Sequence, residues 1–68
     1  MKTLSRLINT VTSTTYAIET EVGVILHTDH FNDKGKVIDS ETIFKENGNH
    51  VTDDTLMLKI LNFIDENE

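Results

Sequence analysis

Cysteine, proline and tryptophan are absent from this 68-residue sequence, and only three glycines occur. Without cysteine, no disulfide, thiolate metal site or cysteine nucleophile can form. No apolar run approaches the roughly 20 residues that a membrane-spanning helix needs. Residues 4–11 are interrupted by polar side chains and do not resemble the apolar part of a signal peptide, so we expect a cytoplasmic protein.

Basic side chains are also scarce. Six Lys and Arg residues stand against twelve Asp and Glu residues, which gives a formal net charge of −6. A nucleic-acid-binding protein needs basic residues to neutralise phosphates, and an anionic membrane surface would repel this chain. We therefore expect neither as a direct partner. Long-range charge favours a basic protein surface instead, although such a charge also serves simply to keep a small protein soluble.

The short length predicts one domain, residues 1–68, with a small hydrophobic core. Burial in such a core barely offsets the conformational entropy that folding removes. Small domains usually add a disulfide, a metal or a partner, and the first is excluded here. We therefore expect a tight partner or a homodimer.

Apolar residues near the beginning of the chain recur with helical spacing, at i, i+3, i+4 and i+7. They are Leu4, Leu7, Ile8 and Val11. This spacing predicts a helix over residues 3–12. From Thr15 the period changes to two, which predicts extended strand to about His30. That length exceeds a usual strand, so residues 15–30 form either one strand bulged at Gly23 or two strands joined by a turn there.

The sequence Asn-Asp-Lys-Gly at 32–35 is typical of a hairpin turn, because Asn and Asp initiate turns and Gly adopts positive φ. It predicts a returning strand over residues 36–45. A register with Asn32 opposite Lys36 places Val24 beside Phe44, Asp29 opposite Asp39 and His27 opposite Glu41.

A second helix is predicted from Thr52, as N-cap, to about Asp65, with a frayed tail beyond. Its apolar stripe consists of Met57, Ile60, Leu61 and Ile64. The expected fold is therefore α+β: a small antiparallel sheet of two or three strands, with the hairpin turn at 32–35 and with an N-terminal and a C-terminal helix packed on one face.

No motif for catalysis is present. No serine has the glycine context of a nucleophile elbow, and neither a glycine-rich phosphate loop nor a dinucleotide fingerprint occurs. We expect no enzyme, no catalytic residue and no cofactor. The predicted register gathers four side chains that could bind a divalent metal: His27, Asp29, Asp39 and Glu41. We interpret them as a solvated or partner-binding face and expect no resident metal.

The acidic residues of the strands are the candidate contact residues for a partner. They are Glu19, Glu21, Asp29, Asp39 and Glu41. Acids two residues apart on a strand are about 6.8 Å apart, close to the spacing of phosphates along one DNA strand. In charge and size the chain resembles small phage-encoded inhibitors that mimic DNA, such as uracil-DNA glycosylase inhibitors and certain anti-CRISPR proteins, although no motif aligns with theirs.

That resemblance implies an inhibitor, of phage or mobile-element type, that docks on the nucleic-acid-binding surface of a host protein. The function expected from the sequence is therefore that of a small acidic, non-enzymatic binding protein. The alternative is a homo-oligomeric structural or regulatory module that uses the C-terminal helix and an open sheet edge.

Overall fold

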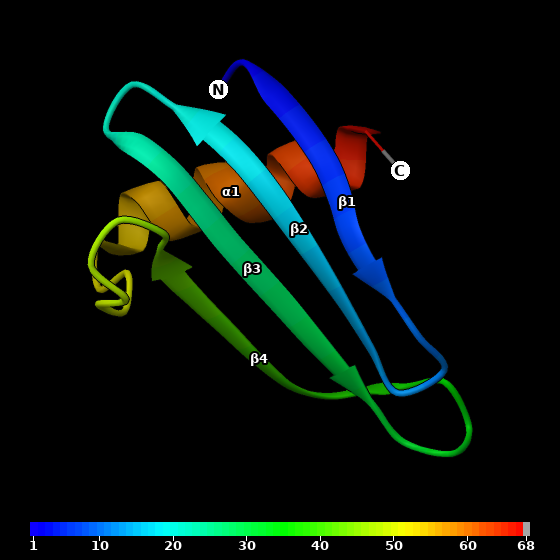
Figure 1. Cartoon of the computed structure of the whole chain (residues 1–68). Helices are drawn as coiled ribbons and strands as arrows, with labels where there is room; N and C mark the ends of the chain where they lie inside the picture. Colours follow the sequence, from blue (N-terminus) through cyan, green and yellow to red (C-terminus); the bar gives the residue numbers. More distant parts are fainter. Residues whose placement is uncertain (68) are drawn as a thin grey trace.

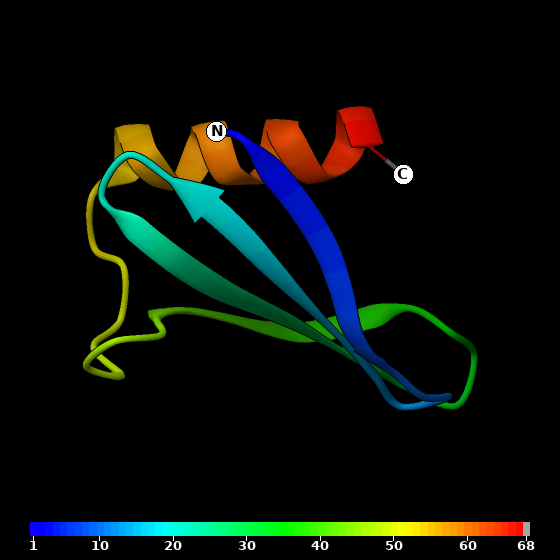
Figure 2. The same cartoon turned by 45° about the horizontal axis from the view of Figure 1, so that its top comes forward.

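The structure is a computed structural model that describes residues 1–67. One antiparallel sheet has the strand order β1-β2-β3-β4 and is followed by a helix. Its elements are β1 (Thr3–Asn9), β2 (Ser13–Thr20), β3 (Gly23–Phe31), β4 (Val37–Phe44) and α1 (Asp54–Asn67). The helix crosses one face of the sheet near the end where the chain begins (Figure 1). The strands extend away from it toward the 9–13 and 31–37 connections (Figure 2).

The predicted N-terminal helix is wrong, because residues 3–9 form strand β1. Of the four residues that suggested a helix, only Leu4 packs against the core; Leu7, Ile8 and Val11 are 56%, 55% and 90% exposed. A helix of ten residues is marginal in water, whereas pairing with β2 gives hydrogen-bond partners to one edge of the β1 backbone. The predicted arrangement of two helices with two or three strands is therefore replaced by four strands and one helix.

Residues 15–30 belong to two strands, which was one of the two alternatives from the sequence. Between β2 and β3 the chain turns at Glu21 and Val22, and Gly23 follows with a φ of 116°. The Thr20 hydroxyl closes the turn, donating to the Gly23 carbonyl at 2.7 Å and accepting from the Val22 amide at 3.1 Å. Because the turn interrupts the alternation, Ile18 and Ile25 face the helix together.

The hairpin turn at 32–35 is confirmed: the Asn32 amide donates to the Lys36 carbonyl at 2.9 Å, and Gly35 has a φ of 78°. The register beyond the turn was predicted wrongly. Phe31 lies opposite Val37, but a bulge follows and His30 then pairs with Asp39. The extra residue shifts the rest of β4 by one position. Phe44 consequently lies opposite Ile25 rather than Val24.

The C-terminal helix is confirmed as an element, but its cap is Asp53 rather than Thr52. The Asp53 Oδ1 accepts from the amides of Thr55 and Leu56, at 2.9 and 3.1 Å, and so satisfies two donors of the first turn. The helix reaches Asn67, past the predicted end at Asp65, and the remaining tail residue lies outside the described residues.

The hydrophobic core lies between α1 and the sheet. Ile60 and Ile64 contribute from the helix, and Tyr16, Ile18 and Ile25 from the two central strands. Val51 closes the core between β4 and the helix. Leu61, predicted to lie in the buried stripe, is 45% exposed. Among residues 1–67, no helix has both the length and the apolar character that crossing a membrane requires.

Candidate functional site

The helix-side face of the sheet is apolar at one end and polar at the other. Beneath the helix, one row of paired positions consists of Leu4, Ile18, Ile25 and Phe44. The next row toward the hairpin tips consists of Arg6, Tyr16, His27 and Thr42. Beyond it lies a third row of Asn9, Thr14, Asp29 and Ser40. All three rows cross the four strands, so the polar rows continue the face that the helix partly covers.

His27 is the centre of a hydrogen-bond network in these polar rows. Its Nε2 lies 2.8 Å from Asp29 Oδ1 and its Nδ1 lies 2.7 Å from Thr42 Oγ1. The Ser40 hydroxyl donates to the same Asp29 oxygen at 2.7 Å. An ionised carboxylate only accepts hydrogen bonds, so in the neutral ring Nε2 carries the proton and Nδ1 accepts from Thr42. The network thereby joins β3 to β4.

An acid, an imidazole and a hydroxyl in this order also form the catalytic triad of serine hydrolases. Here, however, His27 and Thr42 are only 3% and 4% exposed. A substrate cannot reach the Thr42 hydroxyl in this arrangement. The network therefore stabilises the interior of the sheet by satisfying buried polar groups.

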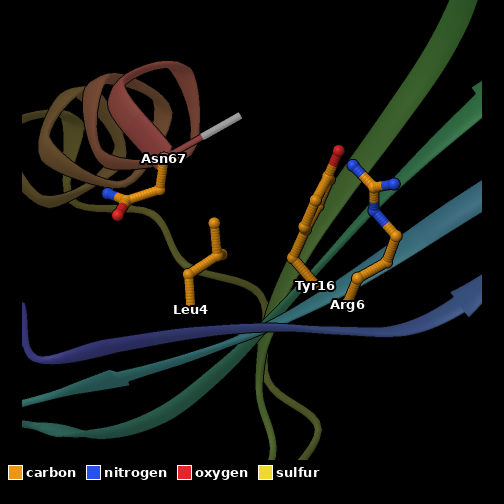
Figure 3. Close-up of a pocket in the computed structure, with 4 residues that line it drawn as sticks. All are labelled: Leu4, Arg6, Tyr16 and Asn67. Atoms are coloured by element: carbon orange, nitrogen blue, oxygen red, sulfur yellow. The ribbon is translucent and has the colours of Figure 1, made fainter.

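A depression of about 240 Å³ lies beside the C-terminal end of the helix, lined by Leu4, Arg6, Tyr16 and Asn67. Figure 3 shows Leu4, Tyr16 and Arg6 rising from the sheet on the helix side, with Asn67 at the end of the helix. The Arg6 guanidinium carbon lies 5.6 Å from the centre of the Tyr16 ring, which is within the range of a cation–π contact. This contact shields the aromatic ring where the helix ends.

The opposite face of the sheet carries no helix, and we call it the open face. Its central row consists of Ser5, Ala17, Leu26 and Ile43. The adjacent row consists of Ile8, Thr15, Thr28 and Glu41. Ala17, Leu26 and Ile43 are half-buried by their neighbours alone. A shallow depression of about 210 Å³ on this face is lined by Thr3, Ser5, Ala17, Glu19 and Val24.

The structure divides the five predicted contact residues between different surfaces. Alternation along the strands puts Glu19, Asp39 and Glu41 on the open face. Asp29 lies on the helix side, bonded to His27. Glu21 lies in the β2–β3 turn, 3.9 Å from the amino group of Met1.

Two expectations from the sequence are overturned by this division. Asp29 lies opposite Ser40, not Asp39, and His27 lies opposite Thr42, not Glu41. The evenly spaced acidic row that suggested a DNA mimic does not exist, because its members face opposite sides of the sheet. No observation on the molecule supports the description as a phage inhibitor.

The alternative metal site is dispersed for the same reason. His27 and Asp29 share the helix side, while Asp39 and Glu41 lie on the open face. Within residues 1–67, no three His, Asp or Glu side chains are grouped closely enough to hold a metal ion.

Sequence reasoning missed the polar rows almost entirely. Thr42 and Ser40 looked like ordinary strand residues, and Arg6 and Asn9 fell in the predicted helix. The one usable signal was His27-x-Asp29, since residues two apart on a strand share a face. That signal identified the pair but not its hydroxyl partners, which depend on the register of β4.

No protein-family model matches this chain, and no curated protein or solved structure does either.

Proposed function

We propose that this protein is a non-enzymatic binding protein that docks on a basic surface of another protein through the open face of its sheet. The observation that carries the proposal is the chemistry of this face. Its strands contribute three carboxylates, from Glu19, Asp39 and Glu41, and no Lys or Arg. The net charge of −6 has the same sign.

Apolar side chains between these acids support an interface rather than a merely solvated surface. Ala17, Leu26 and Ile43 are adjacent across three strands, and Ile8 is 55% exposed beside them. An apolar centre with charged residues around it is the usual anatomy of a protein interface. The acids would increase the rate of encounter with a basic partner, and the apolar centre would slow dissociation.

The first test uses a peptide of lysines as a defined basic probe, titrated into isotopically labelled protein and followed by NMR. At low salt we expect the largest amide shifts at Leu26, Glu41 and Ile43, and we expect them to shrink at physiological salt, where the Debye length is about 8 Å. The largest shifts at the acidic first turn of α1, or no binding at low salt, would contradict the proposal.

A charge-matched pair of variants sharpens this test. Asp39→Asn with Glu41→Gln removes two charges from the open face, and Asp65→Asn with Glu66→Gln removes two from the exposed end of α1. At about 0.2–1 kcal/mol per exposed ion pair, the first variant should weaken binding by roughly 2–30-fold at low salt. The helix variant should weaken it much less. Equal losses would mean that the probe responds to total charge and not to this face.

The alternative function, a homo-oligomeric module, is supported by different surfaces. Leu58 and Leu61 are 61% and 45% exposed on the outer side of α1, and β1 and β4 are both edge strands. In sedimentation experiments without a partner, this alternative predicts association that depends on protein concentration.

A further inference from the structure

The depression of about 210 Å³ on the open face lies over strands β1, β2 and β3. Figure 1 shows the sheet from this side, with α1 behind it. Ser5 and Ala17 form the floor of the depression and lie opposite each other in the β1–β2 pairing. Their side chains are shorter than those of Val24 and Leu26 on the neighbouring strand β3, so the surface is lower here. Two small residues on adjacent strands therefore create the depression.

A single carboxylate lies at the rim of this depression. Glu19 is exposed and lies two residues after Ala17, on the same face of β2. The Thr3 hydroxyl donates to Glu19 Oε1 at 3.2 Å, which restrains the carboxylate toward β1. Val24 pairs with Glu19, is 36% exposed and adds its methyl groups to the lining. The site thus combines apolar methyl groups with one negative charge at their edge.

The charge of Glu19 is not neutralised by the lysines nearest to it in the pairing of the strands. Lys2 precedes Thr3, and strand alternation places its side chain on the helix side. Lys45 lies beyond Val24, whose carbonyl accepts from the Lys45 amide at 3.0 Å, and it does not line the depression. Neither lysine forms an ion pair with Glu19. The carboxylate is therefore accessible to a cation from another molecule.

We propose that this depression receives a lysine side chain of the partner, with its methylene stem on Ala17 and Val24 and its ammonium beside Glu19. The proposal rests on the open face being the docking surface, and it specifies one residue of the basic partner. Lysine suits the site because its stem is apolar and its charge is compact and at the tip. Arginine suits it less, because a guanidinium binds a carboxylate best through both oxygens, and Glu19 Oε1 already accepts from Thr3.

The other two acids of the open face are too far away to share this lysine. Glu41 lies two strands from Glu19 and four residues further along the sheet, about 17 Å away by sheet geometry. Asp39 lies two residues beyond Glu41. A single lysine therefore contacts either Glu19 or the other two acids, and a peptide with one lysine distinguishes these sites.

The probe is a peptide of glycines with one central lysine, blocked at both ends. It is titrated into methyl-labelled protein at physiological salt, where the Debye length of about 8 Å screens distant acids. We expect NMR shifts at the Ala17 and Val24 methyl groups, and NOEs to them from the lysine methylenes. Norleucine in place of lysine removes the ammonium and should weaken binding by up to about fivefold. Equal binding of norleucine, or tighter binding of arginine, would overturn the assignment of lysine.

Three variants of the protein locate the site. Glu19→Gln keeps the shape of the side chain and should weaken lysine binding by up to about fivefold. Its matched control, Glu41→Gln, removes the same charge from the same face and should leave the shifts at Ala17 unchanged. Ser5→Leu fills the floor without changing any charge and should abolish the NOEs. All three positions are exposed, so circular dichroism should match the wild type.

Equal losses for Glu19→Gln and Glu41→Gln, or NOEs that persist in Ser5→Leu, would overturn the depression as the lysine site. The peptide of lysines separates this failure from failure of the proposed function. If that peptide shifts Leu26 and Ile43 while the single lysine leaves Ala17 unshifted, the open face is a docking surface but the depression receives no lysine. If the peptide of lysines does not bind, both proposals fail.

Discussion

Replacing Thr42 by valine tests whether the His27 network stabilises the sheet. Valine has nearly the shape of threonine but lacks the hydroxyl that lies 2.7 Å from His27 Nδ1. With His27 only 3% exposed, water cannot replace the lost partner. A buried polar group without a partner costs about 1–3 kcal/mol. In a domain of this size each kcal/mol lowers the Tm by roughly 4–8 °C, so thermal melting followed by circular dichroism should resolve the change.

The matched control is Thr28→Val, the same substitution on the open face. Thr28 lies in the same strand as His27, is half-buried, and has its Oγ1 3.0 Å from Thr15 Oγ1. Its partner remains accessible to water, so the free energy of unfolding should change by no more than about 0.5 kcal/mol. If both variants melt at the same temperature, the His27–Thr42 hydrogen bond contributes no measurable stability, and the reasoning is refuted. Nitrogen NMR should also show His27 protonated at Nε2 in the neutral ring.

Urea denaturation checks three further predictions. Ile60→Ala should lower the free energy of unfolding by about 2–5 kcal/mol, because Ile60 is fully buried. Leu61→Ala, at an exposed site, should lower it by less than about 1 kcal/mol. A larger loss for Leu61→Ala than for Ile60→Ala would contradict the packing of α1. Asp53→Ala should cost about 1 kcal/mol by removing the helix cap, and Asp53→Asn should restore most of it. Gly35→Ala should cost about 1–2 kcal/mol, because the site has a φ of 78° with open space around it; an unchanged midpoint would mean that the turn rearranges.

Sequence reasoning succeeded where one local signal determined the structure. The residues Asn-Asp-Lys-Gly at 32–35 are by themselves typical of a hairpin turn, and the apolar spacing specified α1, although the cap was predicted at Thr52 and is Asp53. At residues 3–12 the helical spacing was real, but tertiary pairing overrode it, because β2 offers backbone partners to a strand that includes the β-branched residues Thr3 and Ile8. Helical spacing in so short a segment therefore had little predictive value.

The prediction of the candidate site from the sequence failed for a geometric reason. Side chains on a strand alternate with a period of two, so an offset of one residue moves every later side chain to the other face. The β2–β3 turn introduced one such offset between Glu19 and Asp29, and the bulge beside His30 introduced another in β4. The sequence left the first offset open between a bulge and a turn at Gly23, and no residue signal indicated the second. Faces of single strands were predictable, but surfaces that combine strands were not.

The size of α1 explains why the helix side of the sheet is half apolar and half polar. A helix is about 10 Å wide, whereas a strand of nine residues is about 30 Å long. A helix that crosses the strands can therefore shield only one or two rows of side chains. The row with Ile18 and Ile25 lies within its reach, and the row with His27 lies at its margin.

Beyond that margin apolar side chains would lack cover, so hydrogen bonds among His27, Asp29 and Thr42 stabilise that part of the sheet instead. The hairpin tips beyond them have neither helix nor network. Val37, opposite Phe31 at these tips, is 54% exposed, because neither α1 nor the hydrogen-bond network reaches it.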